Sequence, residues 1–247
     1  MTPSVTSMPD LALASLLAGF AFIVSYAGTG ILVRALAARA ILAQPSERSS
    51  HTVPTPTGGG IAVLAGLAPA WLCIATLSDA APAGLAVIVG LAAALAVLSW
   101  IDDLKDLAPA VRLAAQAVVV IAALVFAPFP APVFGGLLPP MLDTLVVALL
   151  WLWFINLFNF MDGIDGIAGV ETAAIGIGIF VAAKLGKLDG HWLMLGLSAA
   201  AAAVGFLRWN WHPAKIFLGD VGSVPLGFLL GWLLLSFAAA GHPIPAL

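Results

Sequence analysis

Long apolar segments alternate with short polar ones along most of the chain. A membrane-spanning helix needs about 20 mostly apolar residues. Stretches of that kind run near residues 11–33, 58–78, 83–101, 112–127, 142–160, 167–183, 190–207 and 222–241, and the fourth is the shortest. A transmembrane β-barrel would instead show short segments of alternating hydrophobicity. The pattern predicts an all-α, polytopic transmembrane bundle of about eight spans, with residues 1–247 forming a single integral membrane domain.

The composition supports a membrane protein. Hydrophobic residues make up 62% of the chain and charged residues only 9%. A soluble domain carries about 25% charged residues, so a soluble enzyme is excluded. The net charge of −3 and the lack of a basic run exclude a nucleic-acid-binding protein. The single cysteine, Cys73, excludes a disulfide scaffold and a cysteine-ligated zinc site.

The basic residues predict how the spans are oriented. Seven of the nine Lys and Arg residues fall in the loops that follow odd-numbered spans. The positive-inside rule places those loops in the cytoplasm and both termini on the outer side. The predicted cytoplasmic loops cover about residues 34–57, 102–112, 159–167 and 208–221.

Three acidic motifs fall on that predicted cytoplasmic side, where carboxylates next to hydrocarbon are costly and usually mark function. The first motif ends an apolar span with Asp102 and Asp103 adjacent. If the helix continues, Asp102 and Asp106 lie one turn apart on one face. Paired carboxylates at a membrane edge suit a divalent cation or a general base. The alternative is a solvated helix end with Lys105 as a local partner.

The second motif places Asn156, Asn159, Asp162 and Asp165 at every third position after an apolar span. Such a row drifts slowly around one side of a helix. Its amide and carboxylate groups suit the recognition of a metal ion and a nucleotide. The alternative is a turn rich in Asn, Asp and Gly between two spans.

The third motif places Asp220 between Gly219 and Gly222, with Ser223 next, just before the last span. A helix beginning there would offer free N–H groups and a positive dipole end to an anion. Asp220 itself suits Mg²⁺, which takes a few carboxylates together with substrate phosphate oxygens. The alternative is an aspartate that caps the helix.

The first predicted cytoplasmic loop is a weaker element. Arg48 and His51 precede three glycines there, so the loop could hold phosphate, but a flexible polar linker would look similar. Together, the carboxylates, amides and cations converge on one face of an apolar bundle. Because the chain lacks a nucleophilic Ser or Cys motif, the chemistry they indicate is metal-assisted phosphoryl transfer on a substrate partly held in the membrane.

Four segments, residues 54–60, 102–105, 156–166 and 219–223, together resemble the polyprenyl-phosphate N-acetylhexosamine-1-phosphate transferases. That family includes phospho-N-acetylmuramoyl-pentapeptide transferase. The resemblance covers residues 45–230, and residues 47–51 and 209–219 look closer to the surface-glycan branch. It implies an enzyme of the bacterial inner membrane with its active site on the cytoplasmic face. The implied reaction transfers N-acetylhexosamine-1-phosphate from a UDP-sugar to undecaprenyl phosphate and releases UMP, as the first membrane step of cell-envelope glycan synthesis.

The resemblance also implies roles for individual residues. Asp102 and Asp103 would lie beside the lipid phosphate, as a base or as a covalent nucleophile, while Asp220 and Asn159 would contact Mg²⁺ or Mn²⁺. Asp162 and Asp165 would hold the nucleotide, and Arg112 and Arg48 would pair with phosphates. The remaining candidates for substrate binding are Asn156, His51, Lys105, Gly219, Gly222 and Ser223. Because the family is often dimeric, a homodimer is also expected.

The sequence departs from the family pattern in three ways. Members usually have ten spans and a further cytoplasmic loop containing His, whereas this chain stops after the eighth predicted span. Thr57 stands where many surface-glycan members have a basic residue, and Lys105 replaces an acidic one. Two rival hypotheses remain. One is a non-catalytic member of the same fold, and the other is a cation-coupled transporter, which usually shows internal repeats and charges near the bilayer midplane.

Overall fold

The computed structural model describes residues 8–40, 42–43, 54–78 and 81–241. This part of the chain contains eight long helices. They are α1 (Met8–Ala38), α2 (Gly60–Leu77), α3 (Leu85–Lys105), α4 (Pro109–Phe126), α5 (Pro140–Met161), α6 (Ile167–Gly186), α7 (Gly190–Asn210) and α8 (Asp220–Ala239). In each helix there is a window long and apolar enough to cross a membrane. The predicted eight-span helical bundle is therefore confirmed, and the protein is a multi-pass membrane protein.

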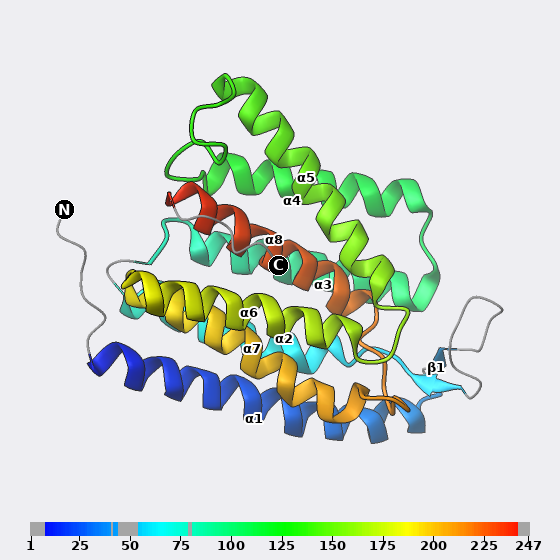
Figure 1. The fold of residues 1–247 in the computed structure, drawn as a ribbon. Coiled ribbons are helices and arrows are strands. Elements are labelled where there is room, and N and C mark those ends of the chain that lie inside the picture. Colours follow the sequence, from blue (N-terminus) through cyan, green and yellow to red (C-terminus); the bar gives the residue numbers. More distant parts are fainter. Residues whose placement is uncertain (1–7, 41, 44–53, 79–80, 242–247) are drawn as a thin grey trace.

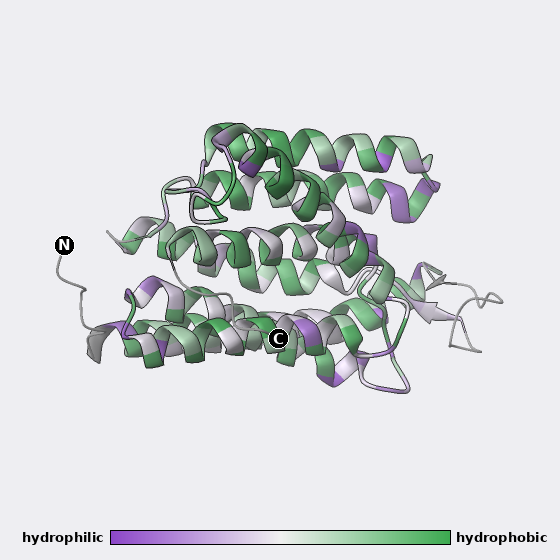
Figure 2. Ribbon diagram, turned by 45° about the horizontal axis from the view of Figure 1, so that its top comes forward, coloured by the Kyte–Doolittle hydropathy of each residue, from purple (hydrophilic) through white to green (hydrophobic). Residues whose placement is uncertain are grey.

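The helices run alternately up and down, so every second loop lies at the same end of the bundle (Figure 1). We call this end the polar end; its described loops are residues 54–59, 106–108, 162–166 and 211–219. Hydrophobic residues cover most of the length of the helices, and hydrophilic residues gather at their ends on the right of Figure 2. The three acidic motifs therefore share one end of the bundle, as the sequence predicts.

Helix α8 forms the centre of the bundle, whereas α4 lies at its rim. The α8 window is 83% buried within the protein, but the α4 window is only 22% buried. Helix α8 packs extensively against α3 and α5. Helix α4 also contacts α3 and α5, but much less, and it lies on the outside of the bundle (Figure 1). The first residue of α8, Asp220, is therefore anchored by the most buried helix of the described chain.

The glycine-rich segment before α2 pairs with the segment before α8. The N–H of Gly59 donates to the carbonyl of Phe217 at 2.9 Å, and the N–H of Gly60 donates to Leu218 at 2.8 Å. A Cβ on Gly60 would lie 2.1 Å from Cα of Gly222, so the two helix starts touch through backbone alone. The described part of the first loop also contains two-residue strands, β1 (Leu42–Ala43) and β2 (Thr55–Pro56), which pair antiparallel.

Candidate active site

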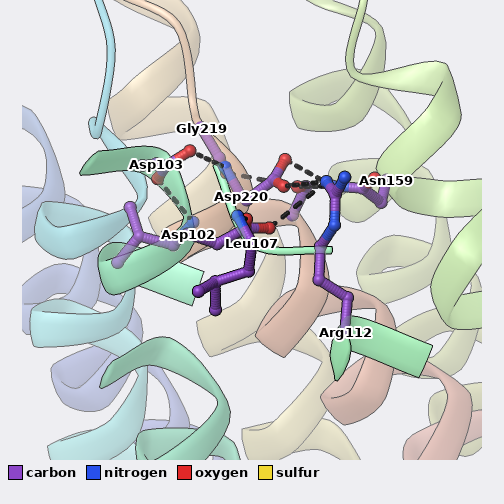
Figure 3. A network of polar contacts seen from close by, with 9 residues as sticks. Asp102, Asp103, Leu107, Arg112, Asn159, Gly219 and Asp220 are labelled. Atoms are coloured by element: carbon purple, nitrogen blue, oxygen red, sulfur yellow. Dashed lines mark hydrogen bonds and ion pairs between the residues drawn. The ribbon is translucent and has the colours of Figure 1, made fainter. Parts of the chain in front are cut away.

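An arginine joins two carboxylates at the polar end of the bundle (Figure 3). Asp102 lies in the last turn of α3, Arg112 in the first turn of α4, and Asp220 at the start of α8. Arg112 Nη1 lies 3.2 Å from Oδ2 of Asp102 and 3.5 Å from Oδ2 of Asp220. The other oxygen of Asp102 accepts the N–H of Leu107 at 2.7 Å, which closes the α3–α4 turn. Residues 118 positions apart in sequence thus form one charged cluster.

Asp103 caps helix α8. Its two carboxylate oxygens accept the backbone N–H groups of Asp220 and Val221, each at 3.0 Å (Figure 3). The next amides, of Gly222 and Ser223, donate to the carbonyl of Gly219. The sequence-based expectation of free N–H groups at this helix end is therefore wrong, because a carboxylate of the protein itself occupies the position of the anion.

Gly219 makes this close approach of three segments feasible. Its φ of +76° lies in the left-handed region, which residues with a side chain rarely adopt. A Cβ at this position would lie 2.9 Å from Oγ1 of Thr57 and 3.1 Å from Oδ2 of Asp103. Gly219 therefore lets the α7–α8 loop pass between the first loop and Asp103.

The two asparagines of α5 face different neighbours. Asn159 Nδ2 donates to Oδ1 of Asp220 and to Oγ of Ser223, both at 2.8 Å. Its nitrogen rather than its oxygen faces Asp220, so in this orientation Asn159 positions the carboxylate and does not offer a metal ligand. Asn156 instead donates to Oε1 of Gln116 on α4 at 2.7 Å.

The polar row of the second motif does not continue on one helix face. Helix α5 ends at Met161, so Asp162 and Asp165 lie in the α5–α6 loop. Asp165 Oδ2 lies 2.8 Å from Nδ1 of His212 and accepts the N–H of Ala214 at 3.0 Å. Asp165 therefore joins the α5–α6 loop to the α7–α8 loop, which carries Asp220.

Burial and neighbouring charges perturb Asp162. Loss of solvation is the main cause that raises the pKa of this carboxyl well above its ordinary value. The negative charges of Asp220 and Asp103 raise the pKa further, and a hydrogen bond from the backbone of Gly219 partly offsets them. Asp162 and Asp220 are thus close enough to repel each other, and a cation between them would relieve this repulsion.

The donor set is compatible with Mg²⁺. Within the described ranges, no group of three or more His, Cys, Asp or Glu side chains could hold a metal ion by itself. Mg²⁺ usually binds one or two carboxylates and takes its other ligands from substrate phosphates and water, so it does not require such a group. Asp162 and Asp220 supply two carboxylates, and the charge of Asp220 acts on Asp162; such a pair fits an ion that shares its coordination with a phosphate.

Of the other predicted site residues, Ser223 belongs to this network through its bond from Asn159, and the rest lie outside it. Lys105 and Asp106 are exposed. Helix α3 ends at Lys105, and Asp106 is its C-cap residue with a φ of 50°. Gly222 packs against Gly60, and the buried Ser223 donates to the carbonyl of Gly219 at 3.1 Å. Arg48 and His51, predicted to contact phosphate, lie outside the described residues.

Sequence reasoning missed three residues that organise the polar end. Gln116 is the one polar residue of α4 besides Arg112, and that isolation is a signal that could have identified it. His212 received no role, yet it pairs with Asp165. The buried Asn210 accepts the N–H of Gly166 and donates to the carbonyl of Ile216, each at 2.9 Å. No sequence pattern pointed to Asn210, because its partners come from two other segments.

Comparison with known proteins identifies the class of this bundle. A family model described as glycosyl transferase family 4 matches residues 85–238, which include the carboxylate cluster and both asparagines. The chain therefore belongs to glycosyl transferase family 4, and the resemblance drawn from the motifs is confirmed.

Individual relatives agree with this assignment. The chain is 34% identical over 248 residues to a decaprenyl-phosphate N-acetylglucosaminephosphotransferase of Mycolicibacterium smegmatis, covering 90% of this chain and 59% of the relative. It is 31% identical over 196 residues to a probable undecaprenyl-phosphate N-acetylglucosaminyl 1-phosphate transferase of Bacillus subtilis, covering 77% and 53%. A phospho-N-acetylmuramoyl-pentapeptide-transferase of Moorella thermoacetica is 40% identical over 91 residues, covering 36% and 28%. The match thus spans little more than half the length of the first two relatives and 28% of the third.

Proposed function

We propose that this protein transfers N-acetylhexosamine-1-phosphate from a UDP-sugar to undecaprenyl phosphate. An oxygen of the lipid phosphate attacks the β-phosphorus of the nucleotide sugar, and the bond from that phosphorus to the bridging oxygen of UMP breaks. The products are an undecaprenyl-diphosphate sugar and UMP. The observation that carries the proposal is the meeting of Asp102, Arg112 and Asp220 at one end of an apolar bundle. A lipid phosphate and a soluble nucleotide can both reach that end.

The residues of the cluster have different roles in binding the phosphate groups and Mg²⁺. The guanidinium of Arg112 lies between two carboxylates, at 3.2 and 3.5 Å, and is 35% exposed. It can therefore turn toward an incoming phosphate without leaving the cluster. Asp220 and Asp162 would hold Mg²⁺, which neutralises charge that develops on the phosphoryl oxygens and the leaving UMP. Asn159 orients Asp220 through a 2.8 Å hydrogen bond.

The hydrogen bonds of the adjacent aspartates favour direct attack over a covalent aspartyl intermediate. Both oxygens of Asp103 accept backbone N–H groups of α8. One oxygen of Asp102 accepts the N–H of Leu107, and the other pairs with Arg112. The oxygens that would attack phosphorus are therefore already engaged by groups of the protein. The lipid phosphate needs no strong base, because its second pKa of about 6 leaves it mostly ionised at neutral pH.

The proposal is tested by incubating membranes that contain the protein with UDP-N-acetylglucosamine, undecaprenyl phosphate and Mg²⁺, and measuring UMP. We expect wild type and the control Asp106→Ala to release UMP and Asp220→Ala to release almost none. Asp106 is the matched control because it is exposed and lies outside the network. Absence of UMP from wild type with every UDP-sugar tried would favour the non-catalytic member of the fold. UMP release independent of Asp220 would also contradict the proposal.

We also propose that the polar end faces the cytoplasm of a bacterial inner membrane. Its described loops and adjoining helix ends contain cations such as Lys105, Arg208 and Lys215, as the positive-inside rule requires. Lys105→Cys in a Cys73→Ala background should react with a membrane-impermeant maleimide only in inside-out vesicles. Labelling in right-side-out vesicles would contradict the orientation. The same UMP assay, repeated with different UDP-sugars, identifies the sugar donor. Uptake of ions by vesicles that contain the protein, without any nucleotide sugar, would instead favour the hypothesis of a cation-coupled transporter.

A further inference from the structure

One hydrogen bond joins the buried Gln116 of α4 to Asn156, which lies on an exposed face of α5. Gln116 is buried, with 5% of its surface exposed, and its Oε1 accepts Nδ2 of Asn156 at 2.7 Å. The same nitrogen of Asn156 also donates to the carbonyl of Leu152 on its own helix at 2.8 Å. Both partners lie within candidate membrane spans, where an amide without a partner would be costly. A direct bond between two side-chain amides therefore fixes the two helices at this level.

The amide pair lies one helical turn from the candidate active site on both helices. Gln116 follows Arg112 by four residues on α4, and Asn156 precedes Asn159 by three residues on α5. Residues at these spacings share a helix face. Arg112 pairs with Asp220, and Asn159 donates to the same aspartate. The bond between Gln116 and Asn156 therefore sets the position of Arg112 on α4 relative to Asn159 on α5, and both of these residues contact Asp220.

Helix α4 has little else to fix its position. It is the least buried of the described spans and packs mainly against α3 and α5. Arg112, at the start of α4, forms the ion pairs with Asp102 and Asp220 that close the cluster. A small rotation or slide of α4 would move the guanidinium away from both carboxylates, so the position of Arg112 depends on the register of α4 against α5.

No substrate group has room to reach Gln116 from the side of the cluster. A cavity lined by Ser99, Asp102, Arg112 and Gln116 has a volume of only about 10 Å³. This is about the least volume that a single water molecule needs, so neither a phosphate nor an isoprene unit can enter. Gln116 therefore acts on the cluster through the protein and not by touching a ligand there.

We propose that Gln116 and Asn156 form a positioning pair that sets the register of α4 and so holds Arg112 against Asp102 and Asp220. Asn156, expected from the sequence to bind substrate, thereby has a role at the contact between α4 and α5. The effect expected on the rate of UMP release rests on the proposed function, but the effect expected on the position of Arg112 does not.

The test uses five variants of the full chain in detergent. Gln116→Leu and Asn156→Leu each remove the bond, and the double Leu variant removes both partners. The exchange variant, Gln116→Asn with Asn156→Gln, keeps the total side-chain length across the gap and should restore the bond. Thr144→Val on α5 is the control, because the hydroxyl of Thr144 donates only within its own helix, to Pro140 at 3.0 Å.

The first readout is the rate at which phenylglyoxal modifies Arg112, measured by peptide mass spectrometry relative to Arg208 in the same sample. Pairing with two carboxylates protects Arg112, so each Leu variant should raise its relative rate several-fold. The exchange variant and Thr144→Val should keep the wild-type rate. An unchanged rate in Gln116→Leu, or an exchange variant as reactive as the Leu variants, would overturn the proposal.

The second readout is UMP release. Displacing a site residue by about 1 Å can cost up to 100-fold, so each Leu variant should lose about 10- to 100-fold in kcat with a smaller change in KM. The double Leu variant should be no worse than either single variant, because the two residues act as one unit. Additive losses that follow thermal stability would overturn the positioning role. If wild type releases no UMP, the proposed function fails, and the arginine modification decides the positioning role alone.

Discussion

Replacing Asp103 tests whether this carboxylate acts as a helix cap or as a chemical group. Its oxygens accept two amides of α8 at 3.0 Å each. Losing an N-terminal capping acceptor costs about 0.5–2 kcal/mol, and a negative charge at a helix start contributes about 0.3–1 kcal/mol. Because Asp103→Ala removes both acceptors at once and Val221 is buried, we expect a loss near the top of the capping range, about 2 kcal/mol.

The assay is thermal unfolding in detergent combined with UMP release. A loss of about 2 kcal/mol corresponds to a fall of about 4–8 °C in the thermal midpoint for a chain of this size. Asp103→Asn keeps one acceptor oxygen and should lose about half as much. Asp106→Asn, on the neighbouring exposed position, removes the charge but keeps a residue that tolerates its φ of 50°, so it should change neither quantity.

The two roles of Asp103 give different patterns. If it is a cap that positions Asp220, activity falls together with the thermal midpoint through the series Asp, Asn and Ala. An unchanged midpoint in Asp103→Ala would refute the capping argument. Complete loss of activity in Asp103→Asn at a nearly wild-type midpoint would show that the carboxylate takes part in the chemistry.

Three further predictions follow from the same geometry. Arg112→Leu removes the positive charge that pairs with both carboxylates and should lower kcat/KM by about 30-fold, the equivalent of about 2 kcal/mol. A wild-type kcat/KM would contradict a bridging role. Gly60→Ala would place a Cβ 2.1 Å from Cα of Gly222 and should cost about 1–3 kcal/mol by thermal unfolding, whereas Gly90→Ala, with nothing within 4 Å, should not destabilise. The pKa of Asp162 is higher in the folded chain than its ordinary value of 3.8. The free energy of unfolding therefore falls as the pH rises from 3.8 to the raised pKa of the folded state. Asp162→Asn should therefore raise the thermal midpoint at neutral pH but leave it unchanged at pH 3.8 or below; a rise of equal size at every pH would contradict the sign.

The spans and their alternation could be predicted because they depend on local composition. The predicted segments match all eight described helices within a few residues, and the largest error is at α1, which continues to Ala38 instead of ending near residue 33. Proline at the first position of α4 and α5 also marks those starts in the sequence. The position of the acidic motifs at one end then follows. They lie in the loops after the third, fifth and seventh spans, and two spans separate each of these loops from the next, so the chain returns to the same end.

The partners of each polar side chain could not be predicted. The sequence suggested a base or nucleophile at Asp103, a metal ligand at Asn159 and a substrate contact at Asn156. In the structure these side chains bond to α8, to Asp220 and Ser223, and to Gln116. A motif fixes which groups are available, but it does not fix the direction in which each group points across a helix interface.

The sequence by itself therefore determined the class of protein, the number of spans and the end of the bundle that carries the acidic motifs. Hydrophobicity and charge act through composition and short-range spacing, so both can be read along the chain. Only the tertiary structure decided that Asp103 caps α8, that Arg112 bridges Asp102 and Asp220, and that Gln116 pairs with Asn156. These contacts join residues up to 118 positions apart, and they depend on helix rotation and register, which packing of the whole bundle sets.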